Sequence, residues 1–204
     1  GRVVVAAERP LGLADLDDGM FEHCRWWAGP GDSLGLVFTA LDIRPIFTIG
    51  SVTADGFAEK FVKTAIDGFG GLDIIINNAG YTWDNVIQKM TDEQWHSIRG
   101  VHLTAPFKIL RAAADYFRHQ SKVEAEAGKE VFRKVVNISS IAGTGGNAGQ
   151  ANYSAGKAGI IGLTKALSKE WGRYKVNVNA VAFGMIKTRL TEAPAGGDAS
   201  IDVE

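Results

Sequence analysis

The sequence of 204 residues contains a single cysteine, Cys24. With one thiol the chain cannot close an internal disulfide, and it cannot build a metal site of the cysteine type. No apolar run reaches the roughly 18 residues that a membrane-spanning helix needs, and the N-terminus lacks the basic and then apolar layout of a signal peptide. We therefore expect a cytoplasmic protein that holds no metal and uses no membrane as a partner.

An excess of charge of either sign is also missing. The chain has 22 Lys and Arg against 23 Asp and Glu, a formal net charge of −1. This balance argues against nucleic acid as a partner, because nucleic acids are bound through basic surfaces. The length suits one domain with a sizeable core. We therefore predict a single domain over residues 1–204, in which residues 1–50 are atypical.

Strands and helices alternate beyond residue 53. Three short apolar runs are typical of strands buried on both faces: 72–77, 135–139 and 175–181. Three longer segments have helical spacing: 53–69, 91–117 and 151–171. Thr53 is a candidate N-cap, Thr91 opens a capping box, and the charged stretch 119–134 is expected to be solvated. This alternation predicts an α/β fold with a parallel sheet and helices on both faces, three layers in all.

Residues 1–50 show less regularity. Strands are predicted near 2–7, 36–38 and 43–49, with no clear helix to join them, and residues 29–35 are expected to form a loop.

A candidate functional segment lies at the end of each of the three predicted strands of the regular part. The segments are Asn77–Gly80, Ser139–Ser140 and residues 183–188. In a doubly wound sheet, ligands bind at the carboxyl ends of the strands. Tyr153 and Lys157 begin the next predicted helix, and their i, i+4 spacing places them on one helix face. A hydroxyl at a strand end with this face beside it can surround one carbonyl oxygen.

Two other interpretations of this helix start remain. Ser154 precedes Lys157 by three residues, the spacing of a serine nucleophile activated by a lysine, but it points roughly 100° away from Tyr153 around the helix. Tyr153 and Lys157 could also be an exposed pair without a catalytic role.

These motifs together resemble the short-chain dehydrogenase/reductase family. The matching residues are "NNAG" (Asn77–Gly80), "NISSIAG" (Asn137–Gly143), "YSAGK" (Tyr153–Lys157) and "NAVAFGMIKT" (Asn179–Thr188). The resemblance spans about residues 51–190 and is closest to the 3-oxoacyl reductases of that family. It implies a Rossmann-like, doubly wound parallel sheet. It also implies an oxidoreductase that transfers a hydride between NAD or NADP and a small-molecule carbonyl or secondary alcohol.

The resemblance also implies roles for single residues. Tyr153 would be the general acid and base. A free tyrosine titrates near ~10, too high for efficient work at neutral pH, and the charge of Lys157 would lower that value. Ser140 would hold the substrate oxygen, and Lys157 would also hold the nicotinamide ribose. The remaining coenzyme contacts would be Asn78, Ala79, Gly80, Gly184, Ile186 and Thr188.

The chain departs from the family in several places. His102 stands where the family has an asparagine that holds a relay water, and it either keeps that role or packs in a helix interface. Phe183 replaces a proline, and Ser51 replaces an aspartate that contacts adenine. No glycine-rich phosphate motif opens the chain. The choice between NAD and NADP, which the family normally sets at the end of the second strand, cannot be predicted. Residues 191–204 are expected to form a mobile loop. Three explanations of the ends stay open: the chain is a fragment, its ends are rebuilt, or its N-terminal region derives from another reading of the gene.

Two competing functions remain. Gly31–Leu34 spells the nucleophile block of the GDSL esterases, with Ser33 as nucleophile, although no histidine follows His119 and His23 lies in no matching motif. The chain could instead be a non-catalytic assembly partner. In the resembled family, helices near 95–118 and 151–171 pack against another subunit, which implies a homodimer or homotetramer. The residues that could be such contacts, or core, are Phe107, Phe117, Leu163 and Leu167.

Overall fold

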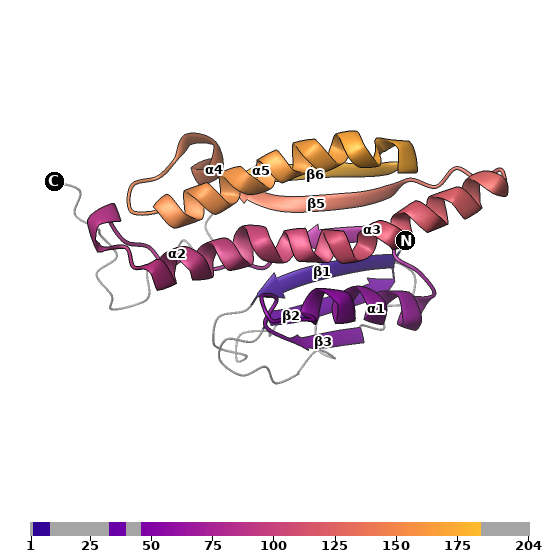
Figure 1. The fold of residues 1–204 in the computed structure, drawn as a ribbon, viewed down its shortest axis with the longest axis horizontal. Helices are drawn as coiled ribbons and strands as arrows, with labels where there is room; N and C mark the ends of the chain where they lie inside the picture. The colour runs from indigo at the N-terminus through magenta and orange to yellow at the C-terminus, as the bar shows by residue number, and fades with distance from the viewer. Residues whose placement is uncertain (1, 9–32, 40–45, 185–204) are drawn as a thin grey trace.

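The computed structural model describes residues 2–8, 33–39 and 46–184, and its six strands form one sheet in the order β3-β2-β1-β4-β5-β6 (Figure 1). The strands are β1 (Arg2–Glu8), β2 (Ser33–Thr39), β3 (Ile46–Gly50), β4 (Ile74–Asn77), β5 (Arg133–Ser140) and β6 (Val176–Phe183). Each strand predicted from the sequence is present, with ends that differ by a few residues. The predicted loop over residues 29–35 is wrong at its end, because Ser33–Gly35 already belong to β2.

The sheet is mixed. β1, β4, β5 and β6 run parallel, as the alternating pattern predicts, with Val4 opposite Ile75 and Ile75 opposite Val135. β2 runs antiparallel to both of its neighbours, with Val37 opposite Val4. An antiparallel pair needs no crossover helix, whereas a parallel pair does. The antiparallel pairing of β2 with β1 and β3 therefore explains why residues 1–50 contain no segment with helical spacing.

The long helices α1, α3 and α5 lie side by side on one face of the sheet, where α1 packs against α3 and α2 packs against α5, while the short α4 follows the carboxyl end of β5 (Figure 1). The helices are α1 (Phe57–Phe69), α2 (Asp92–Arg99), α3 (Ala105–Glu126), α4 (Ile141–Gly145) and α5 (Ala151–Trp171). Single turns are η2 (Ile87–Lys89), η3 (Gly100–Thr104) and η4 (Gly172–Tyr174). The third layer expected from the sequence is not among the described residues.

The capping signals are partly confirmed. Thr91 and Gln94 form the predicted capping box at the start of α2, with bonds of 3.1 Å and 2.9 Å. Thr53 is not the N-cap of α1, so that prediction is wrong. Its hydroxyl lies 2.8 Å from that of Ser51, and α1 begins after Gly56, whose positive φ of 74° suits glycine.

The core fills the space between the sheet and these helices. Its largest fully buried apolar side chains are Phe61, Leu72, Ile75, Ile109, Leu110 and Phe117. Each such side chain contributes about 1.5–3 kcal/mol by burial. Phe117 meets Trp171 edge to face at 5.7 Å, and Leu163 and Leu167 pack against the same core. Phe107, the fourth residue predicted to be a subunit contact or core, differs from Phe117, Leu163 and Leu167 because its side chain is exposed.

The charged stretch 119–134 is not solvated throughout, which corrects the sequence-based expectation. α3 continues to Glu126, and Arg133 at the start of β5 is only 1% exposed. Its guanidinium donates to both carboxylate oxygens of Glu124, at 2.9 Å and 2.6 Å, and to the carbonyl of Leu72 at 3.2 Å. The charge of Arg133 can be buried because each of its three side-chain nitrogens donates to an acceptor.

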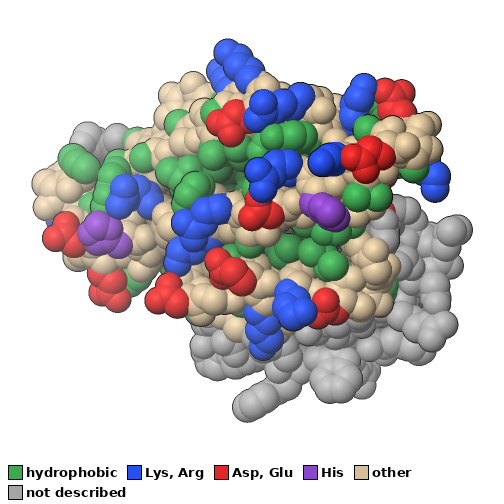
Figure 2. Space-filling view, turned by 45° about the vertical axis from the view of Figure 1, so that its right-hand side comes forward, with side chains coloured by type: hydrophobic (Ala, Val, Ile, Leu, Met, Phe, Trp, Pro, Cys, Tyr) green, Lys and Arg blue, Asp and Glu red, His purple; other side chains and the backbone are tan. Residues whose placement is uncertain are grey.

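Charged side chains are spread over the face seen in Figure 2, where lysines and arginines alternate with acidic residues. Across residues 2–8, 33–39 and 46–184, no helix combines the length and the apolar content that crossing a bilayer requires.

Candidate functional site

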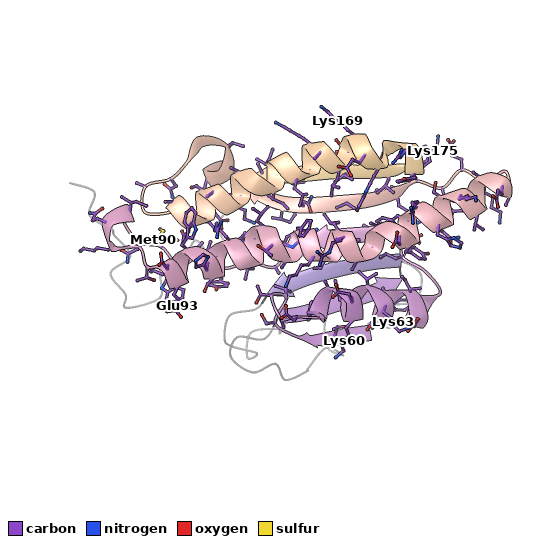
Figure 3. All side chains as sticks on the ribbon, in the orientation of Figure 1. Lys60, Lys63, Met90, Glu93, Lys169 and Lys175 are labelled. Atoms are coloured by element: carbon purple, nitrogen blue, oxygen red, sulfur yellow. The ribbon has the colours of Figure 1, made fainter. Side chains whose placement is uncertain are left out.

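The carboxyl ends of β4, β5 and β6 bring the predicted motifs to one edge of the sheet. Asn77 is opposite Asn137 across β4 and β5, and Ser140 is opposite Phe183 across β5 and β6. Met90 and Glu93, at the entrance to α2, lie at this end of the molecule, whereas Lys175 lies at the other (Figure 3). Asn78, Ala79 and Gly80 follow β4 directly, and Gly184 follows β6.

Lys157 on α5 is anchored to β5 from two sides. Its Nζ donates to the carbonyl oxygen of Ile138 at 2.6 Å, and its own carbonyl accepts from Ser139 Oγ at 2.8 Å. Gly143 permits this approach, because a β-carbon there would lie 2.6 Å from the Lys157 backbone. The Lys157 side chain is 5% exposed, and its Nζ lies 5.6 Å from the centre of the Tyr153 ring.

Ser140 lies at the junction of β5 and α4. It ends β5 and is the N-cap of α4, where its hydroxyl accepts from the Ala142 amide at 3.1 Å. A side-chain hydrogen bond also connects Ser140 with Tyr153, and this bond lowers the pKa of the phenol. Ser140 at the end of β5 and Tyr153 and Lys157 on α5 therefore meet at one end of the sheet.

Burial dominates the acidities of this group. Burial raises the pKa of Tyr153, the bond from Ser140 opposes it, and the charge of Asp84 adds to it. Burial also lowers the pKa of Lys157 to about 8. The sequence-based argument that Lys157 lowers the pKa of Tyr153 is not met in the chain alone, because burial raises that pKa and Lys157 is not among the groups that shift it. The phenol therefore holds its proton at neutral pH, ready to donate it.

His102 lies in the π-helical turn η3, and such turns are frequent at functional sites. Its ring meets Tyr153 edge to face at 4.9 Å and is 4% exposed as a residue. Nε2 lies 2.7 Å from the carbonyl of Tyr81, an acceptor, so Nε2 carries the hydrogen. Burial and the Lys157 charge lower the pKa of His102 to about 3. His102 is therefore neutral, and its Nδ1 has no partner among the described residues.

A short segment after β4 holds the start of α5. Gln150 Nε2 donates to Asp84 Oδ2 at 2.7 Å, and Asn152 Nδ2 donates to the Trp83 carbonyl at 3.1 Å. The backbone N–H of Asn85 donates to the Gly149 carbonyl at 2.9 Å. These contacts were not predicted from the sequence. The signal available was that Gln150 and Asn152 both lie within three residues before Tyr153.

Other predicted residues are not brought into the site. Ser154 Oγ is buried without a partner in the described part of the chain, and the Lys157 ammonium bonds to Ile138 instead. Ser33 begins β2, while His23 lies outside the described residues. Ile186, Thr188 and the loop predicted for 191–204 also lie outside them.

The described residues suit the nicotinamide ribose half of a nicotinamide coenzyme. The Lys157 ammonium has three donors, and one of them is used by Ile138, so donors remain for ribose hydroxyls. The pyrophosphate of a dinucleotide lies at the carboxyl end of the first strand in doubly wound sheets. Here that strand ends at Glu8, and residues 9–32 that follow lie outside the described part.

Comparison with known proteins agrees with this geometry. Residues 39–196 match the family model described as short chain dehydrogenase. The chain is 40% identical to the "3-oxoacyl-[acyl-carrier-protein] reductase FabG" of Vibrio cholerae, over 70% of this chain and 54% of that protein. It is 40% identical to the "Hydroxyacyl-CoA dehydrogenase ChsB1" of Mycobacterium tuberculosis, over 74% and 46%. A crystal structure of a short chain dehydrogenase from Mycobacterium avium is 42% identical, with a TM-score of 0.62 over 70% and 47%.

The chain thus spans about half the length of these relatives. The matched family consists of dehydrogenases, which gives no support to the esterase interpretation of Ser33 or to the serine–lysine interpretation of Ser154.

Proposed function

Because the chain belongs to the short-chain dehydrogenase family, we propose that it is an NAD(P)-dependent oxidoreductase acting on a carbonyl or secondary alcohol. The observation that carries the proposal is the meeting of Ser140, Tyr153 and Lys157 at the carboxyl edge of the sheet. The names of the similar proteins, a 3-oxoacyl reductase and a hydroxyacyl dehydrogenase, favour a 3-oxoacyl thioester or its hydroxy form as the substrate.

The chain's residues divide the work of moving one proton. Ser140 donates to the substrate oxygen and holds it beside the phenol. Tyr153, which is protonated at neutral pH because burial raises its pKa, gives its proton to that oxygen during reduction and takes it back during oxidation. The Lys157 ammonium stabilises the phenolate that remains. The coenzyme, when bound, supplies or accepts the hydride.

His102 extends this set. Its neutral imidazole offers Nδ1 as a bare acceptor, so it can accept a hydrogen bond from a water but cannot give the proton on Nε2, which bonds to Tyr81. We assign it the role of holding a relay water beside Tyr153 and Lys157. The contact of its ring with Tyr153 supports this role, because a ring held in place keeps Nδ1 oriented toward the water.

The coenzyme contacts follow from position along the sheet edge. Asn78, Ala79 and Gly80 after β4 would lie along the adenosine half of NAD or NADP. Gly184, Ile186 and Thr188 after β6 would hold the carboxamide of the nicotinamide.

The setting of the reaction is part of the proposal. We place the protein in the cytoplasm, although one similar yeast protein is named a "Peroxisomal hydratase-dehydrogenase-epimerase". The chain would act as one domain within a homodimer or homotetramer, with Phe107, which is exposed on α3, as a contact between subunits. Size-exclusion chromatography with light scattering, on the wild type and Phe107→Ser, tests the assembly.

A binding and turnover experiment tests the function. Purified protein is titrated with NADH and NADPH by nicotinamide fluorescence, and then assayed with a 3-oxoacyl thioester and a panel of ketones. Tyr153→Phe is expected to bind the coenzyme as the wild type does and to lose roughly 10²–10⁴-fold in kcat, the usual contribution of general acid catalysis. The control Tyr174→Phe should keep both. Failure of the wild type to bind either coenzyme would overturn the proposal.

A further inference from the structure

Asn152 lies directly before Tyr153 in the first turn of α5, and it is completely buried. Its Nδ2 group donates two hydrogen bonds, to the carbonyl of Trp83 at 3.1 Å and to the carbonyl of Gln94 at 3.2 Å. Its Oδ1 accepts from the backbone N–H of Tyr153 at 2.8 Å. One side-chain amide therefore joins three parts of the chain: the segment after β4, helix α2 and the start of α5.

The bond to the Tyr153 amide satisfies an end of α5. The first four N–H groups of a helix have no carbonyl partner within that helix, and Tyr153 is the third residue of α5. The N-cap residue, Gln150, makes no side-chain capping bond. Asn152 supplies the acceptor instead, so the backbone of Tyr153 is bonded to a side chain that α2 and the segment after β4 hold in place.

Helix α2 also leads to the ring that packs on the phenol. His102 lies in η3, which continues from α2, and its ring meets the Tyr153 ring edge to face at 4.9 Å. α5 packs against both α2 and η3. The position of the phenol against this imidazole therefore depends on how the first turn of α5 is set against α2, and the bond from Asn152 to Gln94 joins these two helices.

Lys157 has anchors of its own. Its Nζ donates to Ile138, and its carbonyl oxygen accepts from Ser139, so both of these bonds lead to β5. The bonds of Asn152 lead instead to α2 and to the segment after β4. Loss of the Asn152 amide should therefore displace Tyr153 and leave Lys157 in place.

We infer that Asn152 is a positioning residue for Tyr153, one whose amide fixes the first turn of α5 and so holds the phenol beside Ser140 and His102. The inference rests on the proposed function and deepens it, because a general acid must lie within hydrogen-bond reach of the oxygen that it protonates. Asn152 itself lies behind the phenol, where it contacts backbone groups and takes no part in proton transfer.

Amide hydrogen exchange tests the anchor without turnover. In protein with isotope-labelled tyrosine, observed by NMR, the signal that disappears in Tyr153→Phe identifies the Tyr153 amide. This amide should exchange slowly in the wild type although it lies in a first helical turn. It should exchange about tenfold faster in Asn152→Ala, which corresponds to one lost hydrogen bond. Asn147→Ala is the matched control, because exposed Asn147 also precedes α5 and donates to Gln150 at 2.9 Å, and it should leave the exchange rate unchanged.

Turnover gives the second readout. Asn152→Ala, shown to be folded by circular dichroism, should keep the coenzyme affinity of the wild type and lose up to about 10²-fold in kcat, the cost of a small misplacement of a catalytic group. Asn152→Asp keeps an acceptor for the Tyr153 amide but turns a carboxylate toward two carbonyls, so its kcat should fall to a similar extent. Asn152→Ser, which keeps a small polar group, replaces Asn152→Ala in both measurements if the alanine variant does not fold.

The two proposals can fail separately. Unchanged exchange of the Tyr153 amide in the folded variant, or unchanged kcat, would overturn the inference. A loss of coenzyme affinity as large as the loss of kcat would also overturn it, because Asn152 would then support the whole site and not Tyr153 in particular. Faster exchange in a protein whose wild type binds neither coenzyme would overturn the proposed function and leave the bond between Asn152 and Tyr153 in place.

Discussion

Gly80 lies directly against the imidazole of His102, and a β-carbon at position 80 would come within 2.3 Å of Cε1 and 2.9 Å of Nδ1. The ring has little room to retreat. Its Nε2 is held by the Tyr81 carbonyl at 2.7 Å, and a β-carbon at Gly156 would lie only 3.1 Å from the His102 Cβ. The glycine of the "NNAG" segment therefore makes space for the histidine that replaces the family's asparagine.

Gly80→Ala should consequently displace His102 and destabilise the fold by about 1–3 kcal/mol, the usual cost of an overpacked interior. The cost should be smaller when the shorter Asn replaces His102, because the clash is with the far end of the ring. Chemical denaturation of the two single variants and the double variant measures this coupling. Gly145→Ala is the control, since nothing lies within 4 Å of a β-carbon there. Equal costs in both backgrounds would show that the ring is not what Gly80 accommodates.

Ser140→Ala should change the acidity of Tyr153 as well as the stability of the fold. It removes the N-cap of α4, which typically costs about 0.5–2 kcal/mol, and the hydrogen bond that lowers the pKa of the phenol. The titration midpoint of Tyr153, followed by the ultraviolet absorbance of the phenolate, should therefore move to higher pH. Ser140→Thr, which keeps a hydroxyl, should restore most of both properties. A midpoint that does not respond would contradict the bond between Ser140 and Tyr153.

Glu124→Gln should destabilise the chain far more than an ordinary surface substitution. The Glu124 side chain is 13% exposed and pairs with Arg133, which is 1% exposed, and breaking a buried pair from one side costs about 3–5 kcal/mol. Thermal denaturation measures the loss. Glu126→Gln, whose partner Lys122 is exposed and 3.9 Å away, should change stability by less than about 1 kcal/mol.

The same pair predicts a pH dependence. The bonds from Arg133 hold the pKa of Glu124 below its usual value. A group with a depressed pKa contributes stability above its unfolded pKa and loses it as pH falls toward the folded value. The wild type should therefore lose stability as pH falls below about 4.3, the usual glutamate value, and Glu124→Gln should lose less over that range. Parallel stability curves for the two proteins would exclude this pair as a source of the acid sensitivity.

The meeting of Ser140, Tyr153 and Lys157 could be predicted from the sequence because its signals are local. Ser140, Tyr153 and Lys157 each sit in a short motif at the end of a strand or the start of a helix. The carboxyl ends of parallel strands meet at one edge, so predicting the strands was enough to predict the meeting point. The capping box at Thr91 is local in the same way.

What escaped prediction depends on contacts between distant segments. Asp84 and Gln150 carry no motif, and only the fold brings them within 2.7 Å. Arg133 looks solvated in a charged stretch, and its burial depends on Glu124 and Leu72 lying on either side of it. The antiparallel direction of β2 is likewise a matter of long-range pairing, which apolar runs alone do not encode.

Lys157→Met should make the folded chain more stable at neutral pH while abolishing turnover. Burial lowers the pKa of Lys157 from 10.5 to about 8, so below pH 8 the fold carries an ammonium that would be better solvated in the unfolded chain. A shift of that size corresponds to roughly 3 kcal/mol. The substitution also leaves the Ile138 carbonyl without the Lys157 donor at 2.6 Å. This loss should reduce the gain in folding stability by about 1 kcal/mol.

The sign of the pH dependence separates this explanation from better packing by methionine. Between pH 8 and 10.5 the unfolded wild type binds the Lys157 proton more tightly than the folded chain does, so wild-type stability should rise with pH in that window. The advantage of Lys157→Met should therefore shrink from pH 7 to pH 10. Lys165→Met, at an exposed position of α5, should show a difference from wild type that does not vary with pH. A Lys157→Met advantage that stays constant with pH would mean that the buried ammonium is not what destabilises the site.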